Sequence, residues 1–222
     1  MDNLTLIIPA KNEKESLPSV LDELKKFDLK IIIILEKSDI ETIEAIKDYN
    51  CKIIYQINKG YGDALINGIE NVRTKYFCIF NADGSFNPIE LDNMYKLLKN
   101  DNYDIIFASR YEKNCSSEDD TLITLVGNFI FTKIGNIFFN LKITDILYTF
   151  VMGDAEKTRK LNINSKDFGF CVELPIKAIK NNLKIITSKS HERARLAGKK
   201  KVNAFKDGTL ILFRMIKLFL KN

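Results

Sequence analysis

The first half of the chain alternates short apolar runs with segments of helical periodicity, and this alternation limits the possible folds more than any other feature. Within each run, apolar residues follow one another without interruption, which is typical of strands covered on both faces. Between the runs, apolar residues recur every three or four positions, as at Val20, Leu21 and Leu24. This order predicts an α/β fold with a mostly parallel sheet and helices on both faces. The expected strands span residues 4–8, 30–35, 52–57, 76–80 and 103–108, with a later one at 183–187.

The strand expected at residues 76–80 stops abruptly in a polar turn that holds a single carboxylate, Asp83. In an open parallel sheet, ligands bind beyond the carboxyl ends of the strands. A carboxylate there suits Mg²⁺ or Mn²⁺, which pairs with phosphate oxygens, although Asp and Gly also occur in turns for backbone reasons alone. Other strands end in polar residues at what should be the same edge: Asn12 and Glu13, Glu36, and Arg110. Their convergence predicts a binding site at this edge of the sheet.

Two glycines, Gly60 and Gly62, stand in the loop that leads from the third expected strand into a helix. Glycine allows a ligand to approach the backbone closely, and the helix N-terminus that follows favours negative charge. The spacing is only loosely similar to a dinucleotide fingerprint, and the acidic residue expected about 20 positions later is not cleanly placed. A tight turn into a helix is an equally open interpretation.

The formal net charge of +5 is concentrated near the C-terminus. Residues 191–206 contain six basic side chains against one acid, Glu192, while the rest of the chain is balanced. A concentrated basic segment predicts an anionic partner such as a phosphate, a membrane surface or a nucleic acid. Phe205 is the only aromatic residue between Arg193 and Lys206, so the interleaved stacking residues of nucleic-acid readers are missing and no nucleic-acid partner is expected.

Length and cysteine usage favour a large globular domain in a reducing compartment. The 222 residues suit one large domain, or one domain with a small appendage. The four cysteines lie far apart and form no CxxC pair, which argues against a zinc site or a disulfide framework. The N-terminus has no basic region of the kind that opens a signal peptide. We therefore expect a cytoplasmic protein.

Two stretches in the second half are unusually apolar. Residues 121–152 predict one or two very apolar helices, but Lys133 and three asparagines interrupt them, so an interfacial or buried helix is favoured over a membrane span. Residues 209–222 predict a basic amphipathic helix that is too short to cross a bilayer and suits its surface. A helix docked on the domain is the equally open alternative for this last segment.

Glu173 is a lone acid among the apolar residues of the segment 168–175. An acid in such surroundings is either a structural carboxylate with a charged partner or a functional one with a raised pKa. The sequence leaves both interpretations open.

Five short motifs, in order, resemble the family 2 glycosyltransferases of the GT-A fold and, within them, the dolichyl- or polyprenyl-phosphate sugar synthases. The resemblance covers residues 4–208. The five motifs are Ile8-Pro9-Ala10-Lys11-Asn12-Glu13, the glycine-containing block 58–68, Asn81-Ala82-Asp83, Ser109-Arg110-Tyr111, and Glu192-Arg193 through Lys199-Lys200-Lys201-Val202. Two departures stand out: Asn81 replaces the first acid of the family's Asp-x-Asp, and Thr149-Phe150-Val151 stands where the family usually has Gly-Phe-Arg.

This resemblance implies a metal-dependent, inverting transfer from a GDP- or UDP-linked sugar to a polyprenyl phosphate. Asp83 would be the catalytic metal ligand for Mg²⁺ or Mn²⁺. The implied donor-binding residues are Pro9, Ala10, Asn12, Glu13, Glu36, Lys59, Gly60, Gly62, Asn81, Ala82 and Asp83. The residues implied for the acceptor phosphate are Ser109, Arg110, Arg193, Arg195 and Lys200.

The implied organisation is a transferase domain over residues 1–208, with residues 121–152 facing the acceptor or the membrane, followed by the amphipathic helix 209–222. Such an enzyme would work in the cytoplasm at the inner face of the membrane, with a lipid-linked phosphate as partner. Three alternatives stay open: transfer to a sugar hydroxyl in cell-surface polysaccharide synthesis, nucleotidyl transfer, and non-catalytic membrane binding. A hydroxyl acceptor requires a general base, and Glu173 is the candidate for that role.

Overall fold

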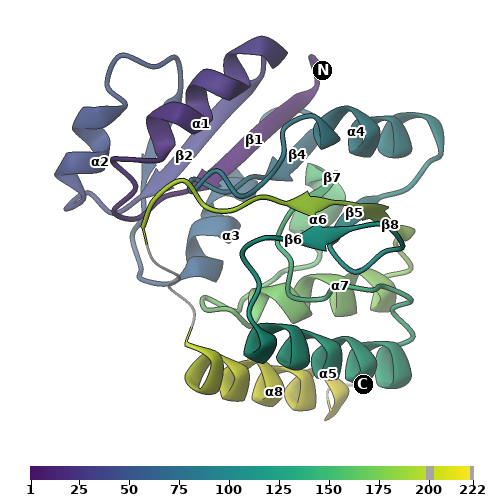
Figure 1. The fold of residues 1–222 in the computed structure, drawn as a ribbon. Coiled ribbons are helices and arrows are strands. Elements are labelled where there is room, and N and C mark those ends of the chain that lie inside the picture. Colours follow the sequence, from purple (N-terminus) through teal and green to yellow (C-terminus); the bar gives the residue numbers. More distant parts are fainter. Residues whose placement is uncertain (199–202, 221–222) are drawn as a thin grey trace.

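The computed structural model describes residues 1–198 and 203–220, and its centre is a mixed sheet of seven strands in this described part of the chain (Figure 1). The strand order is β3-β2-β1-β4-β7-β5-β8. All neighbouring pairs are parallel except those made by β7, which runs antiparallel to both β4 and β5. The strands are β1 (Leu4–Pro9), β2 (Lys30–Leu35), β3 (Lys52–Tyr55), β4 (Tyr76–Ile79), β5 (Ile105–Ser109), β7 (Val151–Asp154) and β8 (Ile185–Lys189).

Helices cover both faces of this sheet, as the sequence predicts. On one face α1 (Leu17–Leu24) and α4 (Glu90–Asn100) share a core with alternate strand residues such as Leu6 and Ile8. On the other face Ile7 belongs to a second core, which includes α3 (Tyr61–Asn71), α6 (Ala155–Lys160) and α7 (Phe170–Lys180). The short elements are η1 (Lys25–Phe27), α2 (Ile40–Ala45), and a separate pair of parallel two-residue strands, β6 (Ser116–Ser117) and β9 (His191–Glu192).

The prediction of helices throughout residues 121–152 is wrong beyond residue 139. Only α5 (Leu122–Phe139) is helical there, and Asn140 ends it in a left-handed conformation. The following segment has no regular structure and buries Leu141, Ile143 and Ile146 before the chain enters β7. The segment is apolar because it is buried in the core, and a buried loop is as rich in apolar residues as a buried helix.

Two helices form an outer layer that lies beyond α7. They are α5 and α8 (Ala204–Leu220), which lie side by side and pack on each other and on α7 (Figure 1). The ring of Phe219 makes edge contacts with Phe138 and Phe139 across this pair. The domain boundary expected at residue 208 therefore falls inside α8, which buries Ile211, Met215 and Leu218.

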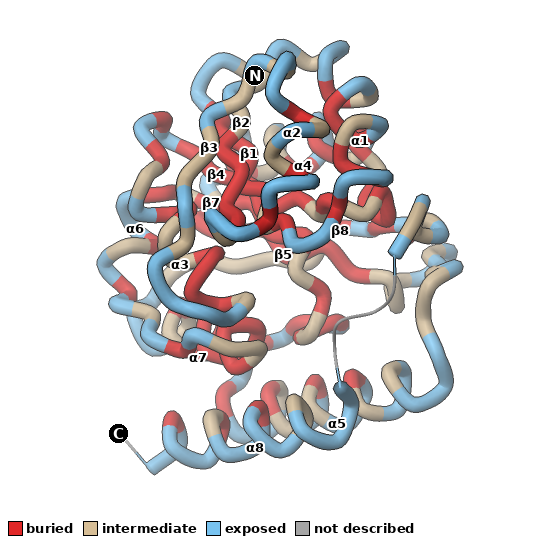
Figure 2. The backbone as a smooth tube through the Cα atoms, turned by 90° about the vertical axis from the view of Figure 1, so that its left-hand side faces the viewer, coloured by how far each residue is buried: buried red, intermediate tan, exposed pale blue. Residues whose placement is uncertain are grey.

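Most apolar residues of the two outer helices are exposed. Figure 2 shows long stretches of both helices in the colour of exposed residues. The face of α5 that is buried consists of Asn128, Thr132, Gly135 and Phe139, so a mostly polar and small stripe points inward and large apolar residues point outward. Among the described helices, α5 alone has the length and composition to cross a membrane, with 22% of it buried. We call the exposed set the α5–α8 apolar face: Leu122, Ile123, Leu125, Val126, Phe129, Ile130, Ile137 and Phe138 of α5, and Phe205, Leu210, Leu212, Phe213, Ile216, Phe219 and Leu220 of α8.

Candidate active site

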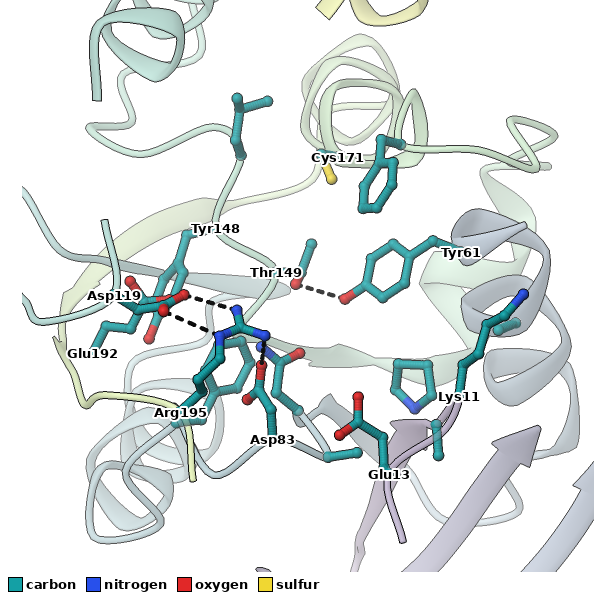
Figure 3. Close-up of a pocket in the computed structure, with 18 of the residues that line it drawn as sticks. Lys11, Glu13, Tyr61, Asp83, Asp119, Tyr148, Thr149, Cys171, Glu192 and Arg195 are labelled. Atoms are coloured by element: carbon teal, nitrogen blue, oxygen red, sulfur yellow. Dashed lines mark hydrogen bonds and ion pairs between the residues drawn. The ribbon is translucent and has the colours of Figure 1, made fainter. Parts of the chain in front are cut away.

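A cavity of about 380 Å³ lies beyond the carboxyl ends of β1, β2 and β4 (Figure 3). Its charged lining comes from the strand ends, the loop before α5 and the segment around β9. Among the described residues that lining has six acids and three bases: Glu13, Glu36, Asp83, Asp119, Asp120 and Glu192 against Lys11, Arg110 and Arg195. Its uncharged wall comes largely from helices and the segments beside them: Thr124 and Asn128 of α5, Leu147, Tyr148 and Thr149 before β7, Phe168 just before α7, Cys171 at the start of α7, and Ile211 of α8.

Most of the residues predicted to bind a donor lie in this lining. Eight of the eleven do: Pro9, Ala10, Glu13, Glu36, Gly60, Asn81, Ala82 and Asp83. The exceptions are Asn12, Lys59 and Gly62. Asn12 has a positive φ of 53° and its N–H donates to Asp39 at 2.7 Å, so its place is in the turn after β1. The carboxyl ends of the parallel strands thus indicate where the site lies, but they do not identify every residue that lines it.

The two glycines of the 58–68 block serve the packing of the protein itself. A Cβ at Gly60 would lie 2.1 Å from the carbonyl oxygen of Lys166, and φ at this position is +125°. A Cβ at Gly62 would lie 2.2 Å from the carbonyl oxygen of Ser165. Both positions require glycine because the backbone of residues 165–167 crosses against them. Gly60 also lines the cavity. The prediction that both glycines make room for a ligand did not include their close packing against the backbone of residues 165–167.

Asp83 lies in the turn after β4 with one oxygen engaged and the other near a cation. Its Oδ1 accepts hydrogen bonds from the N–H of Ser85 at 3.0 Å and from its hydroxyl at 2.7 Å. Its Oδ2 lies 3.6 Å from Nη1 of Arg195. Figure 3 shows the Arg195 guanidinium between the carboxylates of Asp83 and Asp119, and Asp119 accepts from it at 3.1 and 2.9 Å.

The donor set around Asp83 fits Mg²⁺ or Mn²⁺ in the way that nucleotide enzymes hold these ions. The described residues contain no group of three or more His, Cys, Asp or Glu side chains that could cage a metal. Mg²⁺ is usually bound by one or two carboxylates plus substrate phosphates, so Asp83 with the nearby Asn81 suffices if a diphosphate completes the shell. The acidic excess of the cavity wall also favours a cation there.

All three arginines predicted to bind the acceptor phosphate are already paired with carboxylates, Arg195 with Asp119 as described above. Arg110 lines the cavity, but it donates to both oxygens of Asp145 at 2.8 and 3.0 Å and to Glu192 at 3.1 Å. Burial alone would lower the pKa of Arg110, whereas Asp145 and Glu192 raise it overall, so its charge is held within this network. Arg193 lies outside the lining and forms a bidentate pair with Glu23 at 3.2 and 2.9 Å.

The other three residues predicted to bind the acceptor phosphate have three different outcomes. Ser109 is fully buried, bonds Thr144 at 2.7 Å and does not line the cavity, so it is wrong as a contact for a ligand there. Lys200 lies outside the described residues. Arg195 is also paired, with Asp119, but it lines the cavity and its Nη1 lies 3.6 Å from Asp83, so it is the best placed of the five for an anionic ligand bound beside Asp83.

The structure contradicts the expectation that Glu173 could act as a general base. Glu173 is fully buried at the start of α7 and is absent from the cavity lining. Its carboxylate pairs with Lys177 at 2.7 Å and with Arg214, and it accepts the N–H of Ser165 at 2.8 Å. Burial alone would raise the pKa of Glu173, but the hydrogen bonds from Lys177, Ser165 and Arg214 outweigh burial and lower it. Of the two interpretations left open by the sequence, the paired structural carboxylate is the one observed.

Several lining residues were not predicted from the sequence. Asp119 and Asp120 lie in a loop whose polar composition carries no further signal. Tyr61 bonds the hydroxyl of Thr149 at 2.8 Å across 88 residues, a contact that only the fold creates. Asn128 is among the interruptions noted in the apolar stretch, and a polar residue on the buried stripe of an apolar helix was the available signal.

Comparison with known proteins agrees with the fold and the motifs. The family model described as glycosyl transferase family 2 matches residues 5–161, more than two thirds of the chain. The chain belongs to glycosyl transferase family 2. It is thus a glycosyltransferase, and it resembles the polyprenyl-phosphate sugar synthases of that family.

Relatives of this family 2 glycosyltransferase include a dolichyl-phosphate beta-glucosyltransferase of Dictyostelium discoideum, 37% identical over 44% of the chain and 37% of the relative. The low-salt glycan biosynthesis hexosyltransferase Agl6 of Haloferax volcanii is 23% identical over 82% of the chain and 46% of the relative. The chain therefore spans less than half the length of these two transferases. An uncharacterised protein of Methanocaldococcus jannaschii is 25% identical over 97% of the chain and 91% of the relative.

Solved structures share the GT-A architecture. The fold is similar to that of glucosyl-3-phosphoglycerate synthase from Mycobacterium tuberculosis, with a TM-score of 0.78 over 98% of this chain and 80% of the synthase. Sequence identity to that structure is 12%, so the likeness concerns the fold alone. The synthase was crystallised with Mn²⁺, UDP-glucose and phosphoglyceric acid.

Proposed function

We propose that this family 2 glycosyltransferase transfers a sugar, with inversion, from a nucleotide-diphosphate sugar to a polyprenyl phosphate, with Mg²⁺ or Mn²⁺ as cofactor. The observation that carries the proposal is the two-sided cavity, which joins an acidic wall holding Asp83 to an uncharged wall built by α5, α7 and α8. The dolichyl-phosphate glucosyltransferase among the relatives supports the acceptor class. The complex of the mycobacterial synthase makes UDP-glucose the first donor to test, with GDP-linked sugars next.

On the donor side, the nucleotide would lie against Pro9, Ala10 and Gly60, with Glu36 at the end of β2. Lys11 donates to Glu36 at 2.9 Å, and this hydrogen bond lowers the pKa of Glu36, which therefore stays ionised. Asp83 would hold the metal on the diphosphate. A bound metal neutralises negative charge that develops on the leaving nucleotide diphosphate. Without such a cation, the acidic wall would repel both anionic substrates.

On the acceptor side, a polyprenyl phosphate is already an anionic nucleophile at neutral pH and needs no general base. This matches the engagement of Glu173 in ion pairs away from the cavity. A sugar hydroxyl would require a base, and Glu173, the residue expected from the sequence for that role, does not line the cavity. Arg195 would contact the acceptor phosphate through Nη1, which faces Asp83, while Nε and Nη2 stay bonded to Asp119.

The test is a panel of UDP- and GDP-linked sugars incubated with farnesyl phosphate and Mn²⁺ or Mg²⁺. We expect transfer from one nucleotide sugar that EDTA abolishes, with inversion visible by NMR of the product. Transfer to a free sugar in preference to farnesyl phosphate would refute the acceptor class, and full activity in EDTA would refute the metal.

We further propose that the α5–α8 apolar face rests on the inner surface of the cytoplasmic membrane. A lipid-linked phosphate keeps its tail in the hydrocarbon and its head at the interface, so the enzyme must come to that surface. The helices that expose this face also contribute Thr124, Asn128 and Ile211 to the cavity wall. Lys133, Lys206 and Lys217 on the same helices are exposed and suit anionic headgroups, each contributing about 1 kcal/mol near the surface.

Replacing two exposed residues of this face, Ile123→Asp with Phe213→Asp, should abolish sedimentation with vesicles of anionic phospholipid at low salt. Both side chains are more than half exposed, so the substitutions remove apolar surface without disturbing the core. The matched control is Ile89→Asp, an exposed isoleucine beside α4 outside this face, which should leave binding unchanged. High salt should weaken wild-type binding, because exposed charges are screened over about 8–10 Å. Wild-type protein that binds no vesicles at any salt would refute the docking surface.

A further inference from the structure

Asn128 of α5 carries a buried hydrogen-bond donor that has no partner among the residues that the structure describes. The residue is 1% exposed, and its Oδ1 accepts the N–H of Leu147 at 3.0 Å. The other amide atom, Nδ2, makes no hydrogen bond. Because the Leu147 N–H needs an acceptor, it determines the orientation of the amide and leaves the NH₂ group turned away from it. Buried donors are rarely left unsatisfied, so this group points to a missing partner.

The position of this donor connects it with the cavity. Six buried side-chain atoms lack a partner in the described part of the chain, and only Nδ2 of Asn128 belongs to a residue that lines the cavity. The other polar groups on the uncharged wall are engaged. Tyr61 bonds Thr149 at 2.8 Å, Tyr148 bonds Ser190 at 3.3 Å, and Thr124 donates to Asp120. Among the described polar groups of this wall, the Nδ2 group of Asn128 is therefore a buried donor without a hydrogen bond, and it can be offered to a ligand.

The surroundings of Asn128 select the part of the substrates that would reach it. Its wall is built by α5, α7 and α8 and contributes no charged side chain to the lining. Two of these helices carry the α5–α8 apolar face, so an isoprenoid tail would approach from their side. The first oxygens along such a molecule belong to its phosphate. A neutral N–H can donate a hydrogen bond to a phosphate oxygen of the acceptor. The acidic wall around Asp83 would at the same time bind the metal and, through it, the diphosphate of the nucleotide sugar.

We propose that Asn128 binds the acceptor by donating a hydrogen bond from Nδ2 to its phosphate, in the cavity that Arg195 also lines. This inference rests on the proposed function, since it assumes a phosphate acceptor. It assigns a binding residue to a helix in which sequence motifs place none.

The test compares Asn128→Asp and Asn128→Leu with wild-type enzyme. Asn128→Asp keeps an oxygen for the Leu147 N–H, removes the donor and adds a negative charge, whereas Asn128→Leu adds no charge but removes both the donor and the acceptor of the Leu147 N–H. The matched control is Asn136→Asp, eight residues further along α5. Asn136 also accepts a backbone N–H, from Ile143 at 3.2 Å, but its Nδ2 already donates to the Ile143 carbonyl at 2.8 Å, and it lies outside the lining.

We expect both Asn128 variants to raise the KM for farnesyl phosphate about 10- to 100-fold, with the larger effect in Asn128→Asp, because a hydrogen bond to a charged group is lost. Affinity for UDP-glucose, measured by calorimetry without acceptor, should stay unchanged. Asn136→Asp should lower the Tm and leave that KM unchanged.

Folded Asn128 variants with an unchanged KM would overturn the inference. An equal loss of UDP-glucose affinity would also overturn it, because that result would mean that the Nδ2 group of Asn128 bonds the transferred sugar and not the acceptor. Wild-type enzyme that binds UDP-glucose but does not act on farnesyl phosphate is a separate result, which refutes the proposed acceptor itself.

Discussion

Replacing Asp83 with asparagine or alanine should abolish metal-dependent nucleotide binding while leaving the fold intact. The side chain lies in a polar turn beyond β4, where it lines the cavity and its Oδ2 lies 3.6 Å from Nη1 of Arg195. Asp83→Asn is the sharper variant, because it keeps an oxygen for the two hydrogen bonds from Ser85 that shape the turn. A bound metal is worth several kcal/mol of transition-state stabilisation, so transfer should fall by about 10³-fold.

Calorimetric titration with UDP, with and without Mn²⁺, measures this effect without relying on turnover. Wild-type protein should gain affinity when Mn²⁺ is present, and both Asp83 variants should lose that gain. Asp119→Asn is the control, since Asp119 is the other carboxylate bonded to Arg195 but is not a predicted metal ligand. A Mn²⁺-dependent affinity that survives in Asp83→Asn would remove Asp83 from the metal site.

Glu173→Gln should destabilise the protein by about 3 kcal/mol, because it leaves Lys177 and Arg214 without their buried counter-charge. The free energy of unfolding from urea titration measures this loss. The chain offers a matched control in Glu156→Gln, which removes an equivalent pair with Lys160 four residues later, on the exposed surface of α6. That change should alter stability by less than about 0.5 kcal/mol.

The pH dependence of this difference has a definite sign. The pKa of Glu173 is lower in the folded protein than its ordinary value of 4.5, so its carboxylate stabilises the fold above that pH. The stabilisation is lost as the pH falls below 4.5 toward the folded pKa, and the gap between wild type and Glu173→Gln should narrow there. Folded Glu173→Gln should retain transfer activity within a few-fold. A 10²- to 10⁴-fold loss in a folded variant would restore the role of general base.

The sheet could be predicted from the sequence because its strands are marked locally. The run at residues 30–35 is apolar almost throughout and bounded by polar residues, and the observed β2 has the same limits. β7 was missed, since Val151–Asp154 is short and continues an apolar stretch that began in α5. Its antiparallel place between β4 and β5 depends on pairings with Phe77 and Ile105 that lie far away in the sequence.

The edge of the sheet that holds the site also followed from the sequence, because parallel strands bring their carboxyl ends together whatever the loops contain. Asp83, Glu13 and Glu36 line the cavity for that reason. The two apolar helices were likewise visible as composition. The sequence did not show which face of each helix is buried. The inward stripe of α5 depends on contacts with α7, with α8 and with the segment that follows α5.

Only the tertiary structure decided which charged residues are available to a ligand. Arg110, Arg193 and Glu173 have the residue types that the chemistry needs, but each is paired with charges from other elements: Arg110 with Asp145, Arg193 with Glu23, and Glu173 with Arg214. The partners of Arg110 and Arg193 are 35 and 170 residues away along the chain. A charge taken from water must find an opposite charge or hydrogen bonds, and the fold determines which group supplies them. Residue type and local pattern therefore indicated where the chemistry gathers, whereas long-range pairing determined which side chains remain free to perform it.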